Sequence, residues 1–392
     1  MTYLRQHTFC IIFFVFCFNT FGFAQSQSRI KWWHADSIKV PFIEGQYWPE
    51  EVMDKYDRLP ARAKEIVPTK LWNLSKHSAG EMIRFATNAK EIIVKYAVHE
   101  ELSKFHMPAT GVSGVDLYAM DSSGNPFWIA GKYQFKDTIE YIFSHIDFPD
   151  QASAEANYQL YLPLYNSIKW LTIGVQDTAT FQILPVRSKP IVAYGTSIIQ
   201  GGCASRPGLA WTAILGRNLN QPVINLGFSG SGKMEPKMTD LVNEIDAGLF
   251  ILDCMPNLTN SYAFPDHDVE NRFSETIYKI QKKHPGTPII LTEHSGGFAA
   301  NYLDTLKANE YKKSSELIAE IFYKLKKNGV KNIYLLTGKE IGFDINSTVD
   351  GLHPNDIGMM KYAKAYENKI RTILQSDQIK YEKTYKKQLN YE

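Results

Sequence analysis

The chain contains little cysteine. Four cysteines occur in 392 residues, and two of them, Cys10 and Cys17, lie in the apolar stretch near the start. The other two, Cys203 and Cys254, are too few for a disulfide framework, and the sequence leaves open whether they are joined. No Cys or His spacing is typical of a zinc site. The composition excludes a small disulfide scaffold and predicts neither a metal nor another cofactor.

An excess of one charge is also missing. The sequence has 43 Lys and Arg against 41 Asp and Glu, a formal net charge of +2, and the two signs are interspersed. Nucleic-acid binding relies on a concentrated basic face, so no nucleic-acid partner is expected. The Lys- and Tyr-rich end, residues 377–392, is predicted to be a polar tail in solvent.

Long apolar runs are absent except at the start of the chain. Residues 8–18 are rich in Phe and Ile, follow Arg5 and His7, and precede the small residues Gly22 and Ala24. The run is short for a bilayer span and is typical of a secretory signal peptide, here residues 1–24, with a membrane anchor as the alternative. We therefore expect an exported protein, periplasmic or secreted, with no stable membrane span after signal cleavage.

Residues 25–187 are dominated by short runs in which apolar and polar side chains alternate. A hairpin turn is expected at 122–125, and no helical pattern separates the runs. This pattern predicts an antiparallel β-sandwich domain. The expected strands are 91–98, 115–120, 127–130, 139–143, 168–173 and 181–184.

The chain is longer than one hydrophobic core usually serves, so a second domain is expected. Residues 188–376 follow a different pattern from residues 25–187. Here runs rich in Ile, Leu and Val alternate with helical patterns, as in a parallel sheet whose ligands bind beyond the carboxyl ends of the strands. The expected strands are 191–194, 223–226, 249–253, 288–292 and 332–336, and the clearest helices are 269–283, 311–327 and 357–374.

A serine follows the first of these strands in a tight turn, within Ile191-Val-Ala-Tyr-Gly-Thr-Ser-Ile-Ile-Gln-Gly201. Asp350-Gly-Leu-His353 follows the fifth strand. A serine esterase needs a hydroxyl at the end of a strand, an imidazole that takes its proton and a carboxylate that orients the imidazole. Ser197, His353 and Asp350 are therefore the predicted catalytic residues.

Four sequence blocks follow successive strands of the predicted parallel sheet: Gly195-Thr-Ser197, Asn225-Leu-Gly-Phe-Ser-Gly230, Leu252-Asp-Cys-Met-Pro-Asn257 and Asp350-Gly-Leu-His353. These blocks resemble those of the SGNH (GDSL-type) hydrolase family, whose name gives a Ser, a Gly, an Asn and a His in this order. The upstream segment Gly114-Val-Asp-Leu-Tyr118 resembles the Gly-x-Asp-Leu-Tyr signature of a β-sandwich domain that often precedes this hydrolase type. The resemblance implies a flavodoxin-like, three-layer α/β domain with a parallel sheet, preceded by an antiparallel, jelly-roll-like β-sandwich.

The resemblance also implies an oxyanion hole, formed by the backbone N–H groups of Ser197 and Gly230 and the amide of Asn257. Thr196 stands where the broader family commonly has Asp. Apart from the resemblance, Gly230 is equally typical of a turn and Asn257 of a helix cap. A glycan on the acceptor pattern Asn257-Leu-Thr259 would block the hole, which favours export from a bacterium.

Other polar residues near the strand ends are candidates for the acyl or alcohol pocket. His294 is also an alternative base, but no Asp-x-x-His pattern orients it, so His353 is preferred. The four pocket candidates are Arg206, Glu235, Glu293 and His294.

The substrate class follows from the resemblance and from the layout of the chain. The family implies hydrolysis of short-chain esters, and export with a leading sandwich favours deacetylation of a carbohydrate. An acyltransferase or short-chain lipid esterase with the same residues is the alternative, and a glycan-binding protein with an inactive hydrolase domain is a remoter one. The expected partner is an acylated small molecule or glycan, and the oligomeric state is left open.

Overall fold

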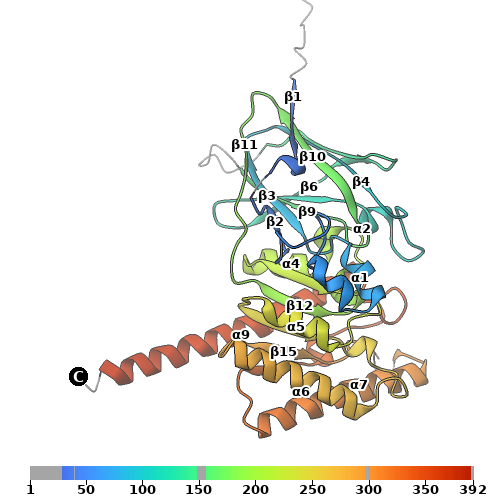
Figure 1. The fold of residues 1–392 in the computed structure, drawn as a ribbon, viewed down its shortest axis with the longest axis vertical. Helices are drawn as coiled ribbons and strands as arrows, with labels where there is room; N and C mark the ends of the chain where they lie inside the picture. The colour runs from blue at the N-terminus through green and yellow to red at the C-terminus, as the bar shows by residue number, and fades with distance from the viewer. Residues whose placement is uncertain (1–28, 39, 148–155, 297, 299–300, 390–392) are drawn as a thin grey trace, which may run out of the picture.

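The computed structural model describes residues 29–38, 40–147, 156–296, 298 and 301–389 (Figure 1). The expected signal peptide, residues 1–24, lies outside this part of the chain. None of the helices in the described residues is both long and apolar enough to cross a membrane.

The first part of the chain forms two antiparallel sheets packed face to face. Strand order is β1-β10-β4-β8-β7 in one sheet and β11-β3-β9-β5-β6 in the other, where β2 also pairs with β3. The strands are β1 (Ile30–His34), β2 (Ile43–Glu44), β3 (Met82–Thr87), β4 (Glu91–Val98), β5 (Asp116–Met120), β6 (Pro126–Ile129), β7 (Lys132–Gln134), β8 (Ile139–Ser144), β9 (Ala156–Tyr161), β10 (Ile168–Gln176) and β11 (Phe181–Ile183).

The alternating side chains explain why this part forms a sandwich. In β8 every second residue is buried, starting with Ile139, Tyr141 and Phe143, and the same inner layer contains Phe85 and Tyr158 from the other sheet. Because side chains alternate between the faces of a strand, each sheet buries one face against the other. Short helical segments connect the strands: η1 (Ala35–Ser37), η2 (Ala61–Glu65), α1 (Thr69–Ser75) and α2 (Ala109–Val112).

The second part is a parallel sheet in the order β13-β12-β14-β15-β16, with helices on both faces. This order is the flavodoxin-like one, so the expected fold class is confirmed. The strands are β12 (Ile191–Gly195), β13 (Val223–Gly227), β14 (Leu249–Asp253), β15 (Ile289–Thr292) and β16 (Ile333–Leu336). The helical segments are α3 (Ser197–Gln200), η3 (Pro207–Leu209), α4 (Trp211–Leu219), α5 (Pro236–Glu244), η4 (Met255–Asn257), α6 (Asp266–Lys283), α7 (Thr305–Lys327), α8 (Gly338–Ile341) and α9 (Asp356–Leu389).

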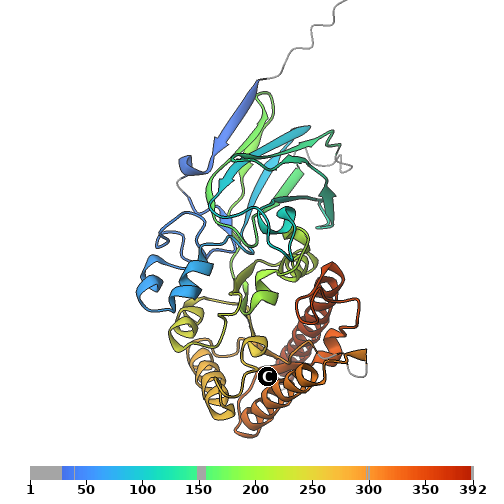
Figure 2. The same cartoon turned by 90° about the vertical axis from the view of Figure 1, so that its right-hand side faces the viewer.

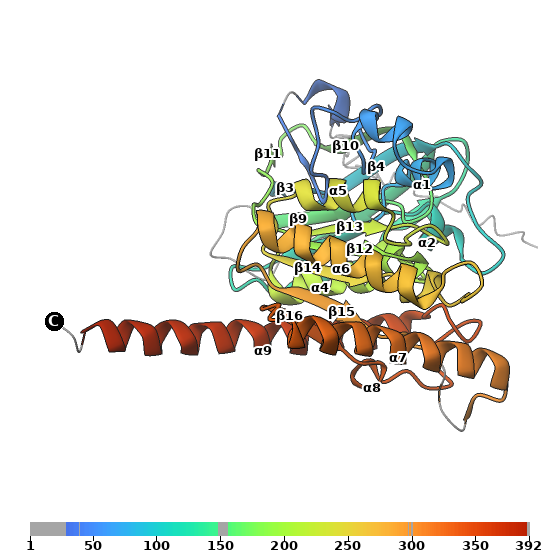
Figure 3. The ribbon, with the colours of Figure 1, turned by 60° about the horizontal axis from the view of Figure 1, so that its bottom comes forward.

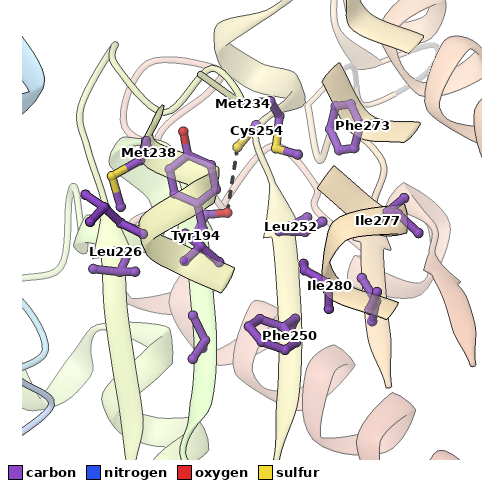
Figure 4. Packing of buried hydrophobic residues seen from close by; sticks show 14 of the residues in the cluster. Tyr194, Leu226, Met234, Met238, Phe250, Leu252, Cys254, Phe273, Ile277 and Ile280 are labelled. Carbon is purple, nitrogen blue, oxygen red and sulfur yellow. Dashed lines mark hydrogen bonds between the residues drawn. The ribbon is translucent and has the colours of Figure 1, made fainter. Parts of the chain in front are cut away.

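Two hydrophobic cores cover the two faces of this sheet. Helices α5, α6 and α7 pack on one face, where Phe273, Ile277 and Ile280 of α6 lie beside Phe250 and Leu252 of β14 (Figure 4). Helices α4 and α9 pack on the other face. Strands buried on both sides are mostly apolar, and all five residues of β12, β13 and β14 are buried.

The sandwich lies on the side of β13, the edge strand of the parallel sheet (Figure 2). Residues of the first part enter both cores of the second: Leu71 and Trp72 of α1 join the core around α5, and Met107 and Tyr165 join the core around α4. The two parts therefore share their hydrophobic cores at the contact.

The last helix is longer than the sequence indicated. A helix was expected over 357–374 and a polar tail over 377–392, whereas α9 continues to Leu389 and extends beyond the body of the protein (Figure 3). The helical backbone continues because no Gly or Pro occurs between Ile357 and Leu389 except Gly358 in the first turn.

A buried carboxyl at the end of β14 makes stability depend on pH. Asp253 is fully buried and accepts a hydrogen bond from the Tyr366 hydroxyl (3.2 Å), while burial raises its pKa to about 7. Because the folded state holds this proton more tightly than the unfolded state, stability should fall as pH rises from about 4 to about 7, by roughly 4 kcal/mol from this group. Urea unfolding should show that the free energy of unfolding falls less between pH 4.5 and pH 8 in Asp253→Asn than in the parent. An equal fall in the variant and the parent would contradict this role of Asp253.

Candidate active site

Ser197 lies at the junction of a strand and a helix. β12 ends at Gly195, and Thr196 caps α3 by accepting a hydrogen bond from the Ile198 N–H (3.3 Å). Ser197 is thus the first helical residue, and it is only 5% exposed. The hydroxyl of Thr196 fills the capping role that an Asp can also fill.

His353 connects Ser197 to a carboxylate. The Ser197 Oγ lies 2.8 Å from His353 Nε2, and His353 Nδ1 lies 2.7 Å from Asp350 Oδ2. The sequence candidates at 197, 350 and 353 are thus brought together from the first and last strands of the sheet. This is the geometry in which an imidazole accepts a proton from a serine hydroxyl while a carboxylate holds its tautomer.

Asp350 is itself fixed by its own loop. Its Oδ1 accepts hydrogen bonds from the backbone N–H groups of Leu352 (3.0 Å) and His353 (2.7 Å). Burial raises the pKa of Asp350, but the hydrogen bonds from the side chain and backbone of His353 outweigh burial, so its pKa lies below the ordinary value. The carboxylate is therefore ionised and fixes the Nδ1–H tautomer of His353 at neutral pH.

The predicted oxyanion residues lie on loops that pack against the nucleophile turn. The Phe228 N–H donates to the Gly195 carbonyl (2.9 Å), and a Cβ on Gly232 would lie 1.8 Å from that carbonyl oxygen, so only glycine fits there. Gly230, between them, has a φ of +63°. Asn257 Nδ2 donates to the Gly232 carbonyl (3.2 Å) and keeps a second amide hydrogen for another acceptor.

Two pocket candidates instead have structural partners. The Arg206 guanidinium pairs with Asp116 and contacts the Tyr118 hydroxyl at 2.7 Å, so it joins the hydrolase part to the Gly-x-Asp-Leu-Tyr segment. Glu235 accepts hydrogen bonds from the Tyr194 hydroxyl (2.7 Å) and the Lys233 N–H (3.0 Å) at the start of α5. The structure directs neither side chain to the Ser197 hydroxyl.

Glu293 and His294 also have hydrogen-bond partners outside the Ser197–His353 pair. Glu293 accepts a hydrogen bond from the Gly338 N–H (2.9 Å). His294 is buried, stacks on Tyr311 with ring centroids 3.9 Å apart, and accepts from the Gly296 N–H (2.9 Å). Burial lowers the pKa of His294 to about 3, so it is a neutral packing residue and His353 is the imidazole beside Ser197.

A loop of the sandwich also reaches the site, which sequence reasoning did not anticipate. The ring of His106 lies 6.1 Å from that of His353, and the ring of Phe105 lies 4.3 Å from that of His106 at a tilt of 52° while remaining fully exposed. Met107 anchors the loop in the core around α4. The sequence signal was weak, because Phe105 and His106 lie in an irregular segment after β4, 247 residues before His353.

Among the described residues, no cluster of three or more His, Cys, Asp and Glu side chains is arranged to hold a metal ion. The two cysteines whose pairing was left open are both free and buried. Cys254 contacts the Tyr194 carbonyl in the core (Figure 4).

Family models match both parts of the chain. Residues 188–371 match the GDSL-like lipase/acylhydrolase family, and residues 30–181 match a model described as the N-terminus of SGNH-hydrolase-type esterases. No curated protein is similar enough to count as a match.

Solved structures give the same result over nearly the whole chain. A protein from Bacteroides ovatus assigned as a GDSL-like lipase is 31% identical with a TM-score of 0.78, and the match covers 88% of this chain and 98% of that one. A salicylyl-acyltransferase from a tetracycline biosynthetic pathway has the same fold at 17% identity and a TM-score of 0.68, covering 88% and 97%. So does a family two carbohydrate esterase from Cellvibrio japonicus, at 12% identity and a TM-score of 0.53, covering 89% and 99%. The chain therefore belongs to the GDSL-like lipase/acylhydrolase family and is a carboxylic ester hydrolase of the SGNH type.

Proposed function

We propose that this protein is an exported serine esterase that removes acetyl groups from a carbohydrate. The observation that carries the serine mechanism is the continuous hydrogen-bonded chain from Ser197 through His353 to Asp350. Export is proposed from the N-terminal sequence pattern alone.

In the proposed reaction, the Ser197 oxygen attacks the ester carbonyl as its proton passes to His353 Nε2. The resulting oxyanion accepts hydrogen bonds from the N–H groups of Ser197 and Gly230 and from the Asn257 amide. Collapse of the tetrahedral intermediate breaks the bond to the alcohol, which leaves with the proton from His353. Water then attacks the acyl-enzyme, again with His353 as base, and releases acetate and free Ser197.

The carbohydrate part of the proposal rests on two observations. One is the shared fold with a family two carbohydrate esterase. The other is the exposed ring of Phe105, which contacts the ring of His106, which in turn lies beside the ring of His353. Because a flat aromatic face suits the apolar face of a sugar ring, Phe105 is proposed to contact the alcohol side of the substrate.

Acyl transfer is the second candidate. It is favoured by the fold shared with the salicylyl-acyltransferase over 97% of that chain. An acyl-enzyme on Ser197 can pass its acyl group to an alcohol in place of water, so the same residues serve both reactions.

Acetate release from acetylated xylan, pectin and mannan tests the proposal, with 4-nitrophenyl acetate as a small ester. Release from one glycan that Ser197→Ala abolishes would support it and identify the glycan. Cleavage of the small ester alone would contradict the carbohydrate assignment, and transfer to an added alcohol faster than hydrolysis would favour acyl transfer.

Phe105→Ala should raise KM for an acetylated oligosaccharide by about 2- to 13-fold, the range expected for one lost ring contact of about 0.5–1.5 kcal/mol. Turnover of 4-nitrophenyl acetate should be unchanged, because this ester has no sugar ring. Phe127→Ala, on β6 of the sandwich, is the matched control. Equal KM values for the oligosaccharide in the parent and both variants would show that Phe105 does not contact the substrate.

A further inference from the structure

Gln200, three residues after Ser197, contacts the loop that carries Gly230. The Gln200 side chain is fully buried, and its Oε1 accepts a hydrogen bond from the Ser229 backbone N–H at 3.0 Å. Ser229 directly precedes Gly230, so this contact holds the peptide bond immediately before the one whose N–H is the proposed oxyanion donor. The mechanism described above assigns Gln200 no role.

The other end of the Gln200 amide is held by the sandwich part of the chain. Its Nε2 donates to the Leu164 carbonyl (3.2 Å) and lies 3.0 Å from His77 Nδ1. Both ends of the amide are therefore oriented by backbone groups, since the Ser229 N–H can only donate and the Leu164 carbonyl can only accept. No flipped amide satisfies both partners.

This orientation determines the tautomer of His77. Because Gln200 Nε2 donates to Nδ1, His77 carries its proton on Nε2, which lies 2.9 Å from Glu100 Oε1. The hydrogen bond from His77 lowers the pKa of Glu100, which keeps this acceptor ionised. Glu100, His77, Gln200 and Ser229 thus form one directional row of hydrogen bonds, which we call the Gln200 relay.

A second contact holds the same loop from the same side. The buried guanidinium of Arg58 donates to the Gly227 carbonyl (2.8 Å) and to the His77 carbonyl (2.7 Å). The segment that presents His77 is therefore tied both to the start of the 227–232 loop and, through Gln200, to Ser229.

We propose that Gln200 and His77 are positioning residues that hold the Gly230 N–H in place for the oxyanion, so that the sandwich contributes to catalysis through the relay. The proposal rests on the oxyanion role assigned to Gly230 above. Gln200 and His77 act through Ser229 and do not touch the substrate.

Gln200→Met keeps the length of the side chain and removes all of its hydrogen bonds. It should lower kcat for 4-nitrophenyl acetate by about 10- to 100-fold with KM changed less than about twofold, because a donor displaced by about 1 Å acts mainly in the transition state. Gln281→Met, on the outer helix α6, is the control for the substitution itself.

A pair of His77 variants separates positioning from packing. The Asn side-chain oxygen takes the place of Nδ1 and can accept from Gln200, whereas the Gln side chain reaches only towards the place of Nε2. His77→Gln should therefore lower kcat as much as Gln200→Met does, whereas His77→Asn should keep most of the parent kcat. Equal losses in the two variants would overturn the proposal.

Hydrogen exchange gives a readout that does not need activity. In Gln200→Met, amide exchange of the peptide covering 227–232 should become at least 10-fold faster, with β14 unchanged. Slower turnover without faster exchange, or faster exchange with unchanged turnover, would each overturn the positioning role. If the parent enzyme cleaves no ester, the proposed function fails, and unchanged exchange would then reject the relay on its own.

Discussion

Replacing Ser197 with alanine should lower kcat for 4-nitrophenyl acetate by about 10⁴- to 10⁶-fold, because the variant has no oxygen to form the acyl-enzyme. KM should change little, since the Ser197 hydroxyl contributes little to ground-state binding. Asp350→Asn should lower kcat by about 10⁴-fold with the fold intact, because an amide no longer fixes the Nδ1–H tautomer that places a free Nε2 2.8 Å from Ser197.

Ser37→Ala, at an exposed serine of the sandwich, controls for loss of a hydroxyl. Thermal unfolding of each variant separates lost chemistry from lost structure. If Ser197→Ala kept more than about one hundredth of the parent turnover, Ser197 would not be the nucleophile and the proposed mechanism would be wrong.

Arg58→Met should lower the free energy of unfolding by about 5 kcal/mol. The Arg58 side chain is fully buried and donates to four carbonyl groups, and the methionine would remove all four of these hydrogen bonds in the interior. Its burial lowers the pKa of the guanidinium to about 10, so it stays charged at neutral pH. The four acceptors are the carbonyls of Leu74 (2.6 Å), His77 (2.7 Å), Asn225 (3.1 Å) and Gly227 (2.8 Å).

Arg62→Met, four residues later, is the matched control. Arg62 pairs with Glu51 and Glu244, but its side chain is 44% exposed, so its loss should cost less than about 1 kcal/mol. Urea unfolding followed by tryptophan fluorescence measures both variants. Equal small losses for Arg58→Met and Arg62→Met would show that the buried guanidinium is replaceable.

Sequence reasoning predicted the parallel sheet well because its signals are local. The strand expected at 249–253 is β14 without any shift, and the Asp350 and His353 candidates lie three residues apart in one loop. Uniformly apolar runs and an Asp-x-x-His spacing can be recognised without knowing the fold. Ser197 was recognised in the same way, from the turn that follows a strand.

The relay and the partners of Arg206 depend on contacts between distant parts of the chain. His77 and Gln200 are 123 residues apart, and nothing near either residue indicates the other. Gln200 was visible in the segment 191–201 that contains Ser197, but its hydrogen bonds to Leu164 and Ser229 appear only in the fold. Arg206 was a candidate for the substrate pocket as a polar residue near a strand end, whereas its guanidinium pairs with Asp116 of the sandwich.

The Arg206 contact also bears on how this protein can be divided and recombined. Asp116 and Tyr118 are the polar residues of the Gly-x-Asp-Leu-Tyr segment, and both bind the guanidinium of Arg206 in the hydrolase part. Asp116 also accepts a hydrogen bond from the Gly208 N–H (3.0 Å). A fragment starting at residue 188 would expose this arginine and both shared cores to water. We therefore expect the sandwich and the hydrolase to fold as a single unit, and a chimera with a relative should keep its junction outside the pair.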